Sequence, residues 1–405
     1  MTKYINYLLI LFAFSLPLKF FLINGLAALL FILWLLEGDL KRKWCILKSS
    51  KIFLLIVSFS LVTLLSYLLW SDTLTQGYYN GHIDNGLKFW FAKLGYKLLL
   101  LPVLLTNMNE KLFKQLVSAF LSAMFLSEII SYGIFLDLWQ VGHATPQDPT
   151  PFLHHTYYSI FLVITIFISL VRFEREENRK LKLFYLFFAT TATINLFVNG
   201  GRTGQLAFIF SALYFVWYHY RFTLKNALIT ATALILLYFA AYHTSPVFKQ
   251  RMSYTKESFQ KLTQGEMQTS FGQRVAIWLT VLEVIKEHPL LGAGAGDAKR
   301  LIEEKQAQYY PDRTYILDLP HIHNQFLQAY LDSGIVAFLL LCYLFYLLLK
   351  EDFYSFDPYA KIFAISLFFL FMTDTPFRFN IGINYVLFFL GLFFGYKYHR
   401  EKLCA

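Results

Sequence analysis

Two histidines and an asparagine stand close together in the segment LPHIHNQFLQAYLDSGI, residues 319–335. His321, His323 and Asn324 come directly before apolar residues at helical spacing, so the pattern predicts that they lie at a helix N-terminus. The partial positive charge at that end disfavours the imidazolium form and keeps a histidine neutral. A histidine here is a candidate general base, and the alternatives are an interfacial histidine without a catalytic role or a metal ligand. No third cluster of ligand residues accompanies the pair in the sequence, so we expect no metal.

Three arginines are candidates for binding an anion. Arg202 lies in NGGRTGQ between two apolar runs, where its glycine neighbours permit close backbone approach. Arg274 lies at the start of FGQRVAIWLTVLEVIKEH, whose apolar residues are spaced as in a helix. Arg378 lies in TPFRFN on the same predicted face. A guanidinium group can bind a phosphate through two parallel hydrogen bonds. The alternatives are a solvated surface residue for Arg274 and an interfacial residue for Arg202 and Arg378, and for Arg378 we favour the interfacial interpretation.

Other polar residues have both a structural and a functional interpretation. Lys93 and Lys97 would share one face of an apolar helix and must either reach the interface or face a polar cavity, where Lys93 could bind phosphate. His154 and His155 begin another apolar run, and we interpret them as mainly structural. The run GAGAG at residues 292–296 does not have the spacing of a phosphate-binding loop, and no strand precedes it. It therefore predicts a tight structural turn.

The elements that position these residues are membrane helices. Of 405 residues, 57% are hydrophobic and only 15% are charged, whereas soluble chains carry about 25% charged residues. A spanning helix needs about 20 mostly apolar residues. Long continuous runs exclude a transmembrane barrel and predict an all-α polytopic membrane protein with about twelve transmembrane helices. The runs lie at about 4–16, 18–36, 52–70, 87–106, 112–136, 152–171, 181–198, 204–219, 224–243, 333–349, 360–375 and 380–396.

The distribution of positive charge predicts the orientation. With a cytoplasmic N-terminus, the cytoplasmic segments hold 20 Lys and Arg, and the short outer loops hold three. Cytoplasmic loops retain positive charge, so both termini should be cytoplasmic. The net charge of +10 is then mainly a topology signal, and we expect no nucleic-acid partner.

One long hydrophilic segment, residues 244–330, falls on the outer side and contains helical patterns. The predicted organisation is a membrane domain at 1–243 with about nine spans, a large periplasmic loop at 244–330 and a membrane domain at 331–405 with about three spans. Cys45 and Cys404 fall on the cytoplasmic side and Cys342 within a span. We therefore expect no disulfide.

The order of these motifs resembles a known superfamily. GRTG before a span, GQRVAIW and HPLLGAGAGD in a long outer loop, and then HIHNQFLQAYLDSGI resemble the O-antigen ligases, the O-antigen polymerases and the bacterial O-oligosaccharyltransferases. The resemblance covers roughly residues 195–350 by motif and the whole chain by layout. It implies a transferase fold of the GT-C kind at the bacterial inner membrane, with the active site facing the periplasm.

The resemblance also implies a reaction. A glycan on undecaprenyl diphosphate would be transferred to an acceptor hydroxyl without a metal or another cofactor. Arg202 and Arg274 match the paired arginines that bind the diphosphate, and His323 matches the base. Lys93 is a further diphosphate-binding candidate, while His321, Asn324 and Arg378 would support the base or bind the acceptor.

The length and the single dominant outer loop favour a ligase, which would use lipid A-core as acceptor. A polymerase or a protein O-oligosaccharyltransferase is the alternative within the superfamily. A transporter or flippase of lipid-linked sugar is the alternative of a different class, but transporters usually show internal repeats, and none is visible in this sequence.

Overall fold

The computed structural model describes residues 1–18, 23–69, 77–79, 82–84, 90–91, 95–220, 223–319 and 321–404. Almost all of its regular structure is helical, and β1 (Gly77–Tyr79) pairs with β2 (His82–Asp84) as one short antiparallel hairpin. The prediction of an all-α polytopic membrane protein is confirmed.

The helices follow the apolar runs of the sequence. The first half of the chain contains α1 (Thr2–Ser15), α2 (Ile23–Leu36), α3 (Leu40–Ser49), α4 (Lys51–Leu69), η2 (Tyr96–Leu99), α6 (Leu100–Asn107), α7 (Glu110–Phe135), α8 (His155–Arg175) and α9 (Arg179–Val198). The second half contains α10 (Arg202–Tyr220), α11 (Leu224–Thr244), α12 (Pro246–Thr263), α13 (Ser270–Glu287), α14 (Ala298–Tyr309), η3 (Thr314–Ile316), α15 (Gln325–Lys350), η4 (Tyr354–Phe356), α16 (Asp357–Thr373), η5 (Pro376–Arg378) and α17 (Asn380–Arg400).

Eight helices of the described chain are long and apolar enough to cross a membrane, and each coincides with a predicted span: α4, α7, α8, α9, α11, α15, α16 with η4, and α17. Four predicted spans are not among them. The helices α1 and α2 have only 14 residues each, α10 begins with the polar sequence RTGQ, and the run at 87–106 lies partly outside the described residues. A count of about twelve therefore requires these four segments to cross as well.

The most buried helices form the centre of the bundle. Nearly every residue of α17 is buried, as expected for a helix that is apolar on all faces. Aromatic rings fill the space around it: Phe389 packs against Phe363 of α16 and Phe120 of α7, with ring centroids 5.2 and 5.4 Å apart. This core fixes the ends of α8 and α16, from which several site residues project.

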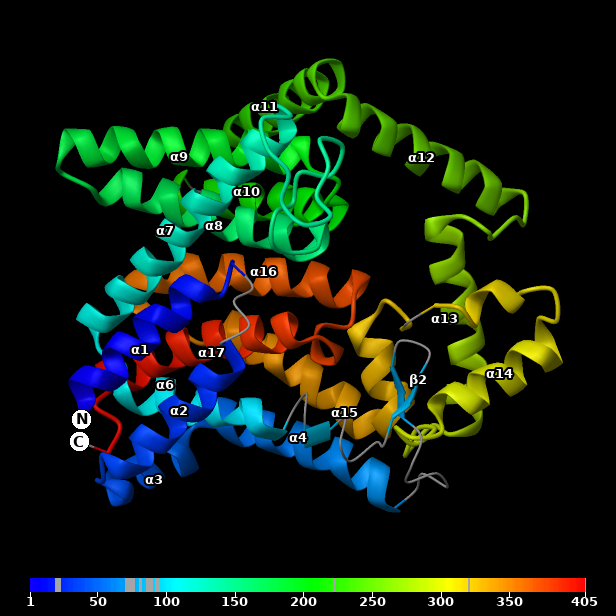
Figure 1. The fold of residues 1–405 in the computed structure, drawn as a ribbon, viewed down its shortest axis with the longest axis horizontal. Helices are drawn as coiled ribbons and strands as arrows, with labels where there is room; N and C mark the ends of the chain where they lie inside the picture. Colours follow the sequence, from blue (N-terminus) through cyan, green and yellow to red (C-terminus); the bar gives the residue numbers. More distant parts are fainter. Residues whose placement is uncertain are drawn as a thin grey trace.

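The polar segment between α11 and α15 lies at one end of the bundle. Figure 1 shows both chain termini at the left end and α13 and α14 at the right, with α12 extending along the upper right. None of these three helices is a candidate span. Helix α11 ends at Thr244 and α15 begins at Gln325, so the second boundary lies a few residues before the predicted one. The division into domains and the periplasmic side of this segment remain predictions.

The glycine run is a structural turn, as predicted. Gly292 and Gly294 have φ values of +72° and +82°, which are unfavourable for residues with a Cβ. The run lies against α15 where that helix is interrupted at Gly334, which has φ of +73°. The N–H of Ala293 donates to the carbonyl oxygen of Leu331 at 2.7 Å. The turn thus anchors the polar segment between α11 and α15 to α15 itself.

The expectation of no disulfide was wrong. Cys45, in α3, and Cys404, after α17, form a disulfide with their Cα atoms 6.0 Å apart. The two positions are separated by 359 residues in the chain, so only the packing of the two termini brings them together. Cys342, in α15, is free.

Candidate functional site

The loop before α15 places the histidines as the sequence predicted. Asn324 is the N-cap of α15, and its Oδ1 accepts a hydrogen bond from the N–H of Leu327 at 3.1 Å. Its side chain therefore has a structural role that satisfies a free N–H of the first turn. His323 precedes it with φ of +54°, a conformation uncommon for a residue other than glycine. The tight turn places the His321 and His323 rings 3.9 Å apart between centroids.

Hydrogen bonding assigns the proton on His321. The backbone N–H of His323 donates to Nδ1 of His321 at 3.2 Å, so this nitrogen must be the unprotonated one. In neutral imidazole the proton then lies on Nε2. Nε2 faces Oδ1 of Asp374 at 3.5 Å. Both nitrogens of His321 are thus engaged, and His323 is the histidine with the freer ring.

Burial keeps both histidines neutral. It lowers the pKa of His323 to about 4, and electrostatic interactions with the positively charged Arg274 and with His154 lower it further. Burial also lowers the pKa of His321 to about 2, with contributions from His323 and Arg378. At neutral pH each ring can accept a proton, which a general base requires.

Asp374 is a site residue that the sequence analysis missed. It follows the last residue of α16 and is buried. Burial raises the pKa of its carboxyl group to about 6, while a hydrogen bond from the backbone of Thr375 and the charge of Arg274 oppose the rise. The sequence did contain a signal for Asp374, because it is an acidic residue between two apolar runs. Ionisable groups next to the apolar part of a membrane are energetically costly and often have a function.

Arg202 and Arg274 come from different elements to the same region. Arg202 is the first residue of α10, which packs tightly on α8: a Cβ on Gly201 or Gly204 would lie within 2.4 Å of Ser159 side-chain atoms. The glycines of GRTG thus permit close helix packing and fix the start of α10. Arg274 lies in the first turns of α13 and within the electrostatic range of Asp374.

These two arginines have few internal partners. Arg202 donates to hydroxyl oxygens of Thr255 at 3.1 Å and Ser270 at 3.5 Å. Arg274 makes no ion pair or side-chain hydrogen bond with another described residue. Burial lowers the pKa of Arg274, and the charge of Asp374 counteracts this. Half-buried guanidinium groups that make no ion pair are suited to bind an anion.

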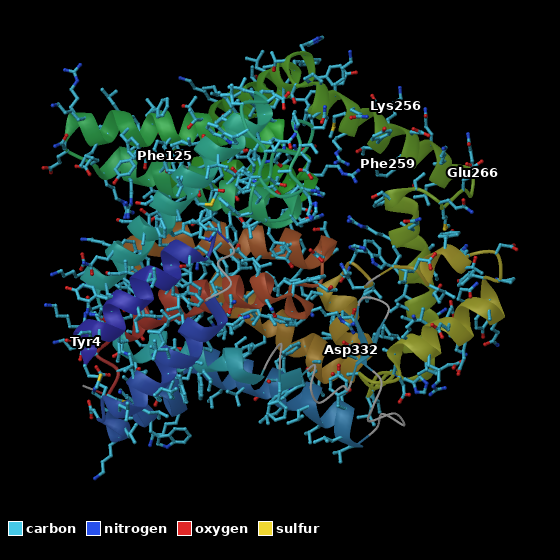
Figure 2. All side chains as sticks on the ribbon, in the orientation of Figure 1. Tyr4, Phe125, Lys256, Phe259, Glu266 and Asp332 are labelled. Carbon is cyan, nitrogen blue, oxygen red and sulfur yellow. A yellow bond between two sulfur atoms is a disulfide. The ribbon has the colours of Figure 1, made fainter. Side chains whose placement is uncertain are left out.

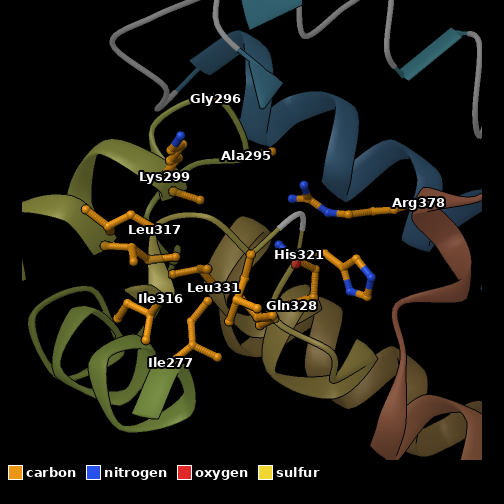
Figure 3. Close-up of a pocket in the computed structure, with 14 residues that line it drawn as sticks. Ile277, Ala295, Gly296, Lys299, Ile316, Leu317, His321, Gln328, Leu331 and Arg378 are labelled. Carbon is orange, nitrogen blue, oxygen red and sulfur yellow. The ribbon is translucent and has the colours of Figure 1, made fainter. Parts of the chain in front are cut away.

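Arg378 differs because its charge is neutralised. It belongs to η5, and its Nη2 lies 3.2 Å from Oδ2 of Asp332, to which it donates a hydrogen bond. Oδ1 of Asp332 also accepts a hydrogen bond from Gln328 at 2.8 Å. Arg378 and His321 line a small cavity of about 50 Å³ between α13, α14 and α15 (Figure 3). The structure places Arg378 beside the histidines, as a paired rather than a free cation.

The histidines that begin α8 face the same region. His154 and His155 lie 3.8 Å apart between ring centroids, and Nδ1 of His155 lies 3.3 Å from Oδ2 of Asp148. Burial is the main cause that lowers the pKa of His154 to about 4, and the electrostatic interaction with His155 adds to it. His154 also acts electrostatically on His323, so it lies nearer the candidate base than a purely structural interpretation implied.

A metal could in principle use part of this cluster. One ligand atom each from His321, His323 and Asp374 lies within 4.8 Å of the others, so the third ligand that the sequence did not reveal comes from Asp374. Two features oppose a cation here: the backbone N–H of His323 occupies Nδ1 of His321, and Arg274 brings positive charge to both His323 and Asp374. Metal independence remains a prediction.

Lys93 lies outside the described residues. The other predicted site residues do come together: His321, His323 and Asn324 form one loop, with Arg274, Arg378 and Arg202 around it. A second residue that the sequence analysis missed is Arg251 of α12, whose positive charge acts on Arg202 and His154.

Comparison with known proteins finds a similarity over the segment that contains most of these residues. Residues 186–342 match the family model described as O-antigen ligase. This segment of the chain is similar to the O-antigen ligase family. The matched segment runs from α9 into α15. It includes Arg202 and Arg274, and also His321 and His323. An uncharacterized protein of Haemophilus influenzae is 25% identical over 248 residues, 60% of this chain and 61% of that protein. The similarity thus spans less than two thirds of the relative's length.

Proposed function

We propose that this protein is a membrane glycosyltransferase of the O-antigen ligase type. It moves a glycan from undecaprenyl diphosphate to a sugar hydroxyl of lipid A-core, at the periplasmic face of the bacterial inner membrane. The observation that carries the proposal is a neutral histidine beside arginines that make no ion pair with a described residue, within the segment similar to O-antigen ligases and at one end of an apolar bundle. This grouping at one end favours chemistry there over transport through the midplane.

The arginines would hold the leaving group. As the bond between the anomeric carbon and the diphosphate oxygen breaks, its electron pair stays on that oxygen. The guanidinium groups of Arg202 and Arg274 are fixed by the starts of α10 and α13. Fixed donors in a site of low water content stabilise developing charge without reorganising.

His323 would activate the acceptor. Its neutral imidazole takes the proton from the acceptor hydroxyl as the hydroxyl oxygen attacks the anomeric carbon. His321, held between the backbone N–H of His323 and the carboxylate of Asp374, fixes the turn that presents His323. A direct displacement of this kind inverts the anomeric configuration.

The test is transfer by purified protein in lipid vesicles that contain the lipid-linked donor and lipid A-core. We expect Arg202→Ala and Arg274→Ala to lose roughly 10²–10³ in rate, and His323→Ala to lose roughly 10²–10⁴. His288→Ala and Arg300→Gln are matched controls on exposed residues of the outer segment. Full activity of His323→Ala would remove the proposed base.

Deletion of the gene separates the ligase from its close alternative. A ligase defect should accumulate full-length glycan on the lipid carrier, because the polymer is made but not transferred. A polymerase defect should accumulate single repeat units instead, and that result would overturn the assignment to a ligase.

A further inference from the structure

Arg251 occupies an unusual place against the GRTG loop. It lies in the second turn of α12, in the outer segment, and its guanidinium group rests on the bare backbone of Gly200. A Cβ built on Gly200 would lie 2.9 Å from Nη2 and 3.0 Å from Nε of Arg251. Because only glycine leaves this space, the guanidinium group reaches the loop that ends at Arg202.

Three positive charges then gather without an ion pair to any acid that the structure describes. The carboxyl group of Asp374 acts on Arg274 electrostatically but forms no ion pair with it. Arg274 and Arg251 both act electrostatically on Arg202, and neither makes an ion pair with a residue that the structure describes. The acid that interacts with Arg251 is Asp148, which is 3.3 Å from His155 and hydrogen-bonded to it.

Three other enclosed cations of the described chain each have an acidic partner. Lys43 pairs with Glu37 at 2.9 Å, Lys305 pairs with Glu287 at 2.6 Å, and Arg378 pairs with an aspartate. Burying like charges together is unfavourable unless an opposite charge joins them. The three arginines therefore fit an anion with several charges.

We propose that Arg251 is a third arginine of the diphosphate site, and that it binds the charge that appears only as the glycan leaves. This inference rests on the proposed function. A diphosphate that links lipid to sugar is a diester with two ionised oxygens. Breaking the anomeric bond leaves the electron pair on the diphosphate, which then carries a third negative charge. Three positively charged guanidinium groups match the three negative charges of the leaving diphosphate better than the two negative charges of the bound donor.

The match between three guanidinium groups and three negative charges predicts which kinetic constants depend on Arg251. An interaction that is stronger in the transition state than in the bound donor raises kcat and leaves KM nearly unchanged. Arg251→Gln should therefore lower kcat by roughly 10²-fold, while donor KM changes by less than about threefold. Arg251→Lys should recover only part of the loss, since an ammonium group cannot make two parallel hydrogen bonds.

Binding of two simple probes tests the inference without the full substrate. Farnesyl diphosphate is a monoester that carries the additional charge, and its terminal methyl ester is a diester that lacks it. The wild type should bind the monoester more tightly. Arg251→Gln should lose that preference, with about tenfold weaker binding of the monoester and nearly unchanged binding of the diester.

Two further variants separate binding from structure. Gly200→Ala keeps the arginine but displaces its guanidinium group, so it should weaken monoester binding selectively. Lys256→Gln removes one positive charge from an exposed position of α12, labelled in Figure 2. It should leave the binding of both probes unchanged. Thermal unfolding in detergent checks that each variant is folded.

The outcomes distinguish this inference from the proposed function. The third-arginine assignment would be overturned if Arg251→Gln weakened binding of both probes equally, or if it weakened binding of neither. If the wild type transfers glycan and Arg251→Gln does so at full rate, only this inference fails. If the wild type transfers no glycan but prefers the monoester through Arg251, the anion site stands and the proposed function fails.

Discussion

Replacement of Asp374 by asparagine should change how activity depends on pH. Burial raises the pKa of the Asp374 carboxyl group to about 6, so the carboxylate is lost as pH falls through that value. The charged form is the one that attracts the Nε2 proton of His321, 3.5 Å away. Below pH 6 this restraint on the histidine turn should weaken, and the rate should fall.

The magnitude follows from the two pKa values. With a pKa of about 6, about nine tenths of Asp374 is ionised at pH 7 and about one tenth at pH 5. His323, with a pKa of about 4, is still about nine tenths neutral at pH 5. If transfer needs the carboxylate, the rate should fall about tenfold between pH 7 and pH 5, and Asp374 accounts for nearly all of that fall.

The assay is kcat/KM for glycan transfer from pH 4 to pH 8, which reports the groups of the free enzyme. Asp374→Asn should be slower at pH 7 but nearly independent of pH down to about pH 5. Below that, both proteins should lose activity as His323 becomes protonated. The role of Asp374 is refuted if wild type and variant show the same acid limb.

The remaining predictions concern metal, topology and stability. EDTA should leave transfer by the purified protein unchanged, and restoration by a divalent ion after chelation would overturn the general-base assignment. A periplasm-dependent reporter should be active when fused at Gln147 or Gln264 and silent at Lys180 or Ser355; activity at Lys180 contradicts the orientation. Gly334→Ala places a Cβ 2.0 Å from a carbonyl oxygen at φ of +73°, so it should cost roughly 1–3 kcal/mol, and an unchanged unfolding midpoint would argue against the tight turn.

Local sequence decided the parts of this protein that depend on neighbouring residues. A run of about 20 apolar residues forms a helix in a bilayer, because each backbone group must find its partner within the segment. The eight candidate spans therefore coincide with runs visible in the sequence. The helix start at Asn324 and the turn at Gly292 could also be predicted from the local sequence. Capping and positive φ depend on only a few adjacent residues.

Tertiary structure decided which distant residues share a site. Asp374 lies 53 positions after His321, Arg251 lies 51 positions after Gly200, and Cys45 meets Cys404 across 359 residues. No local pattern encodes these approaches, because they depend on how α3, α12 and α16 pack against other helices. The sequence by itself determined the all-α membrane fold with the eight candidate spans, and it supplied the candidate histidines and arginines. Only packing could show that Arg378 is neutralised while Arg251 is not, since pairing depends on which carboxylate comes within a few ångströms.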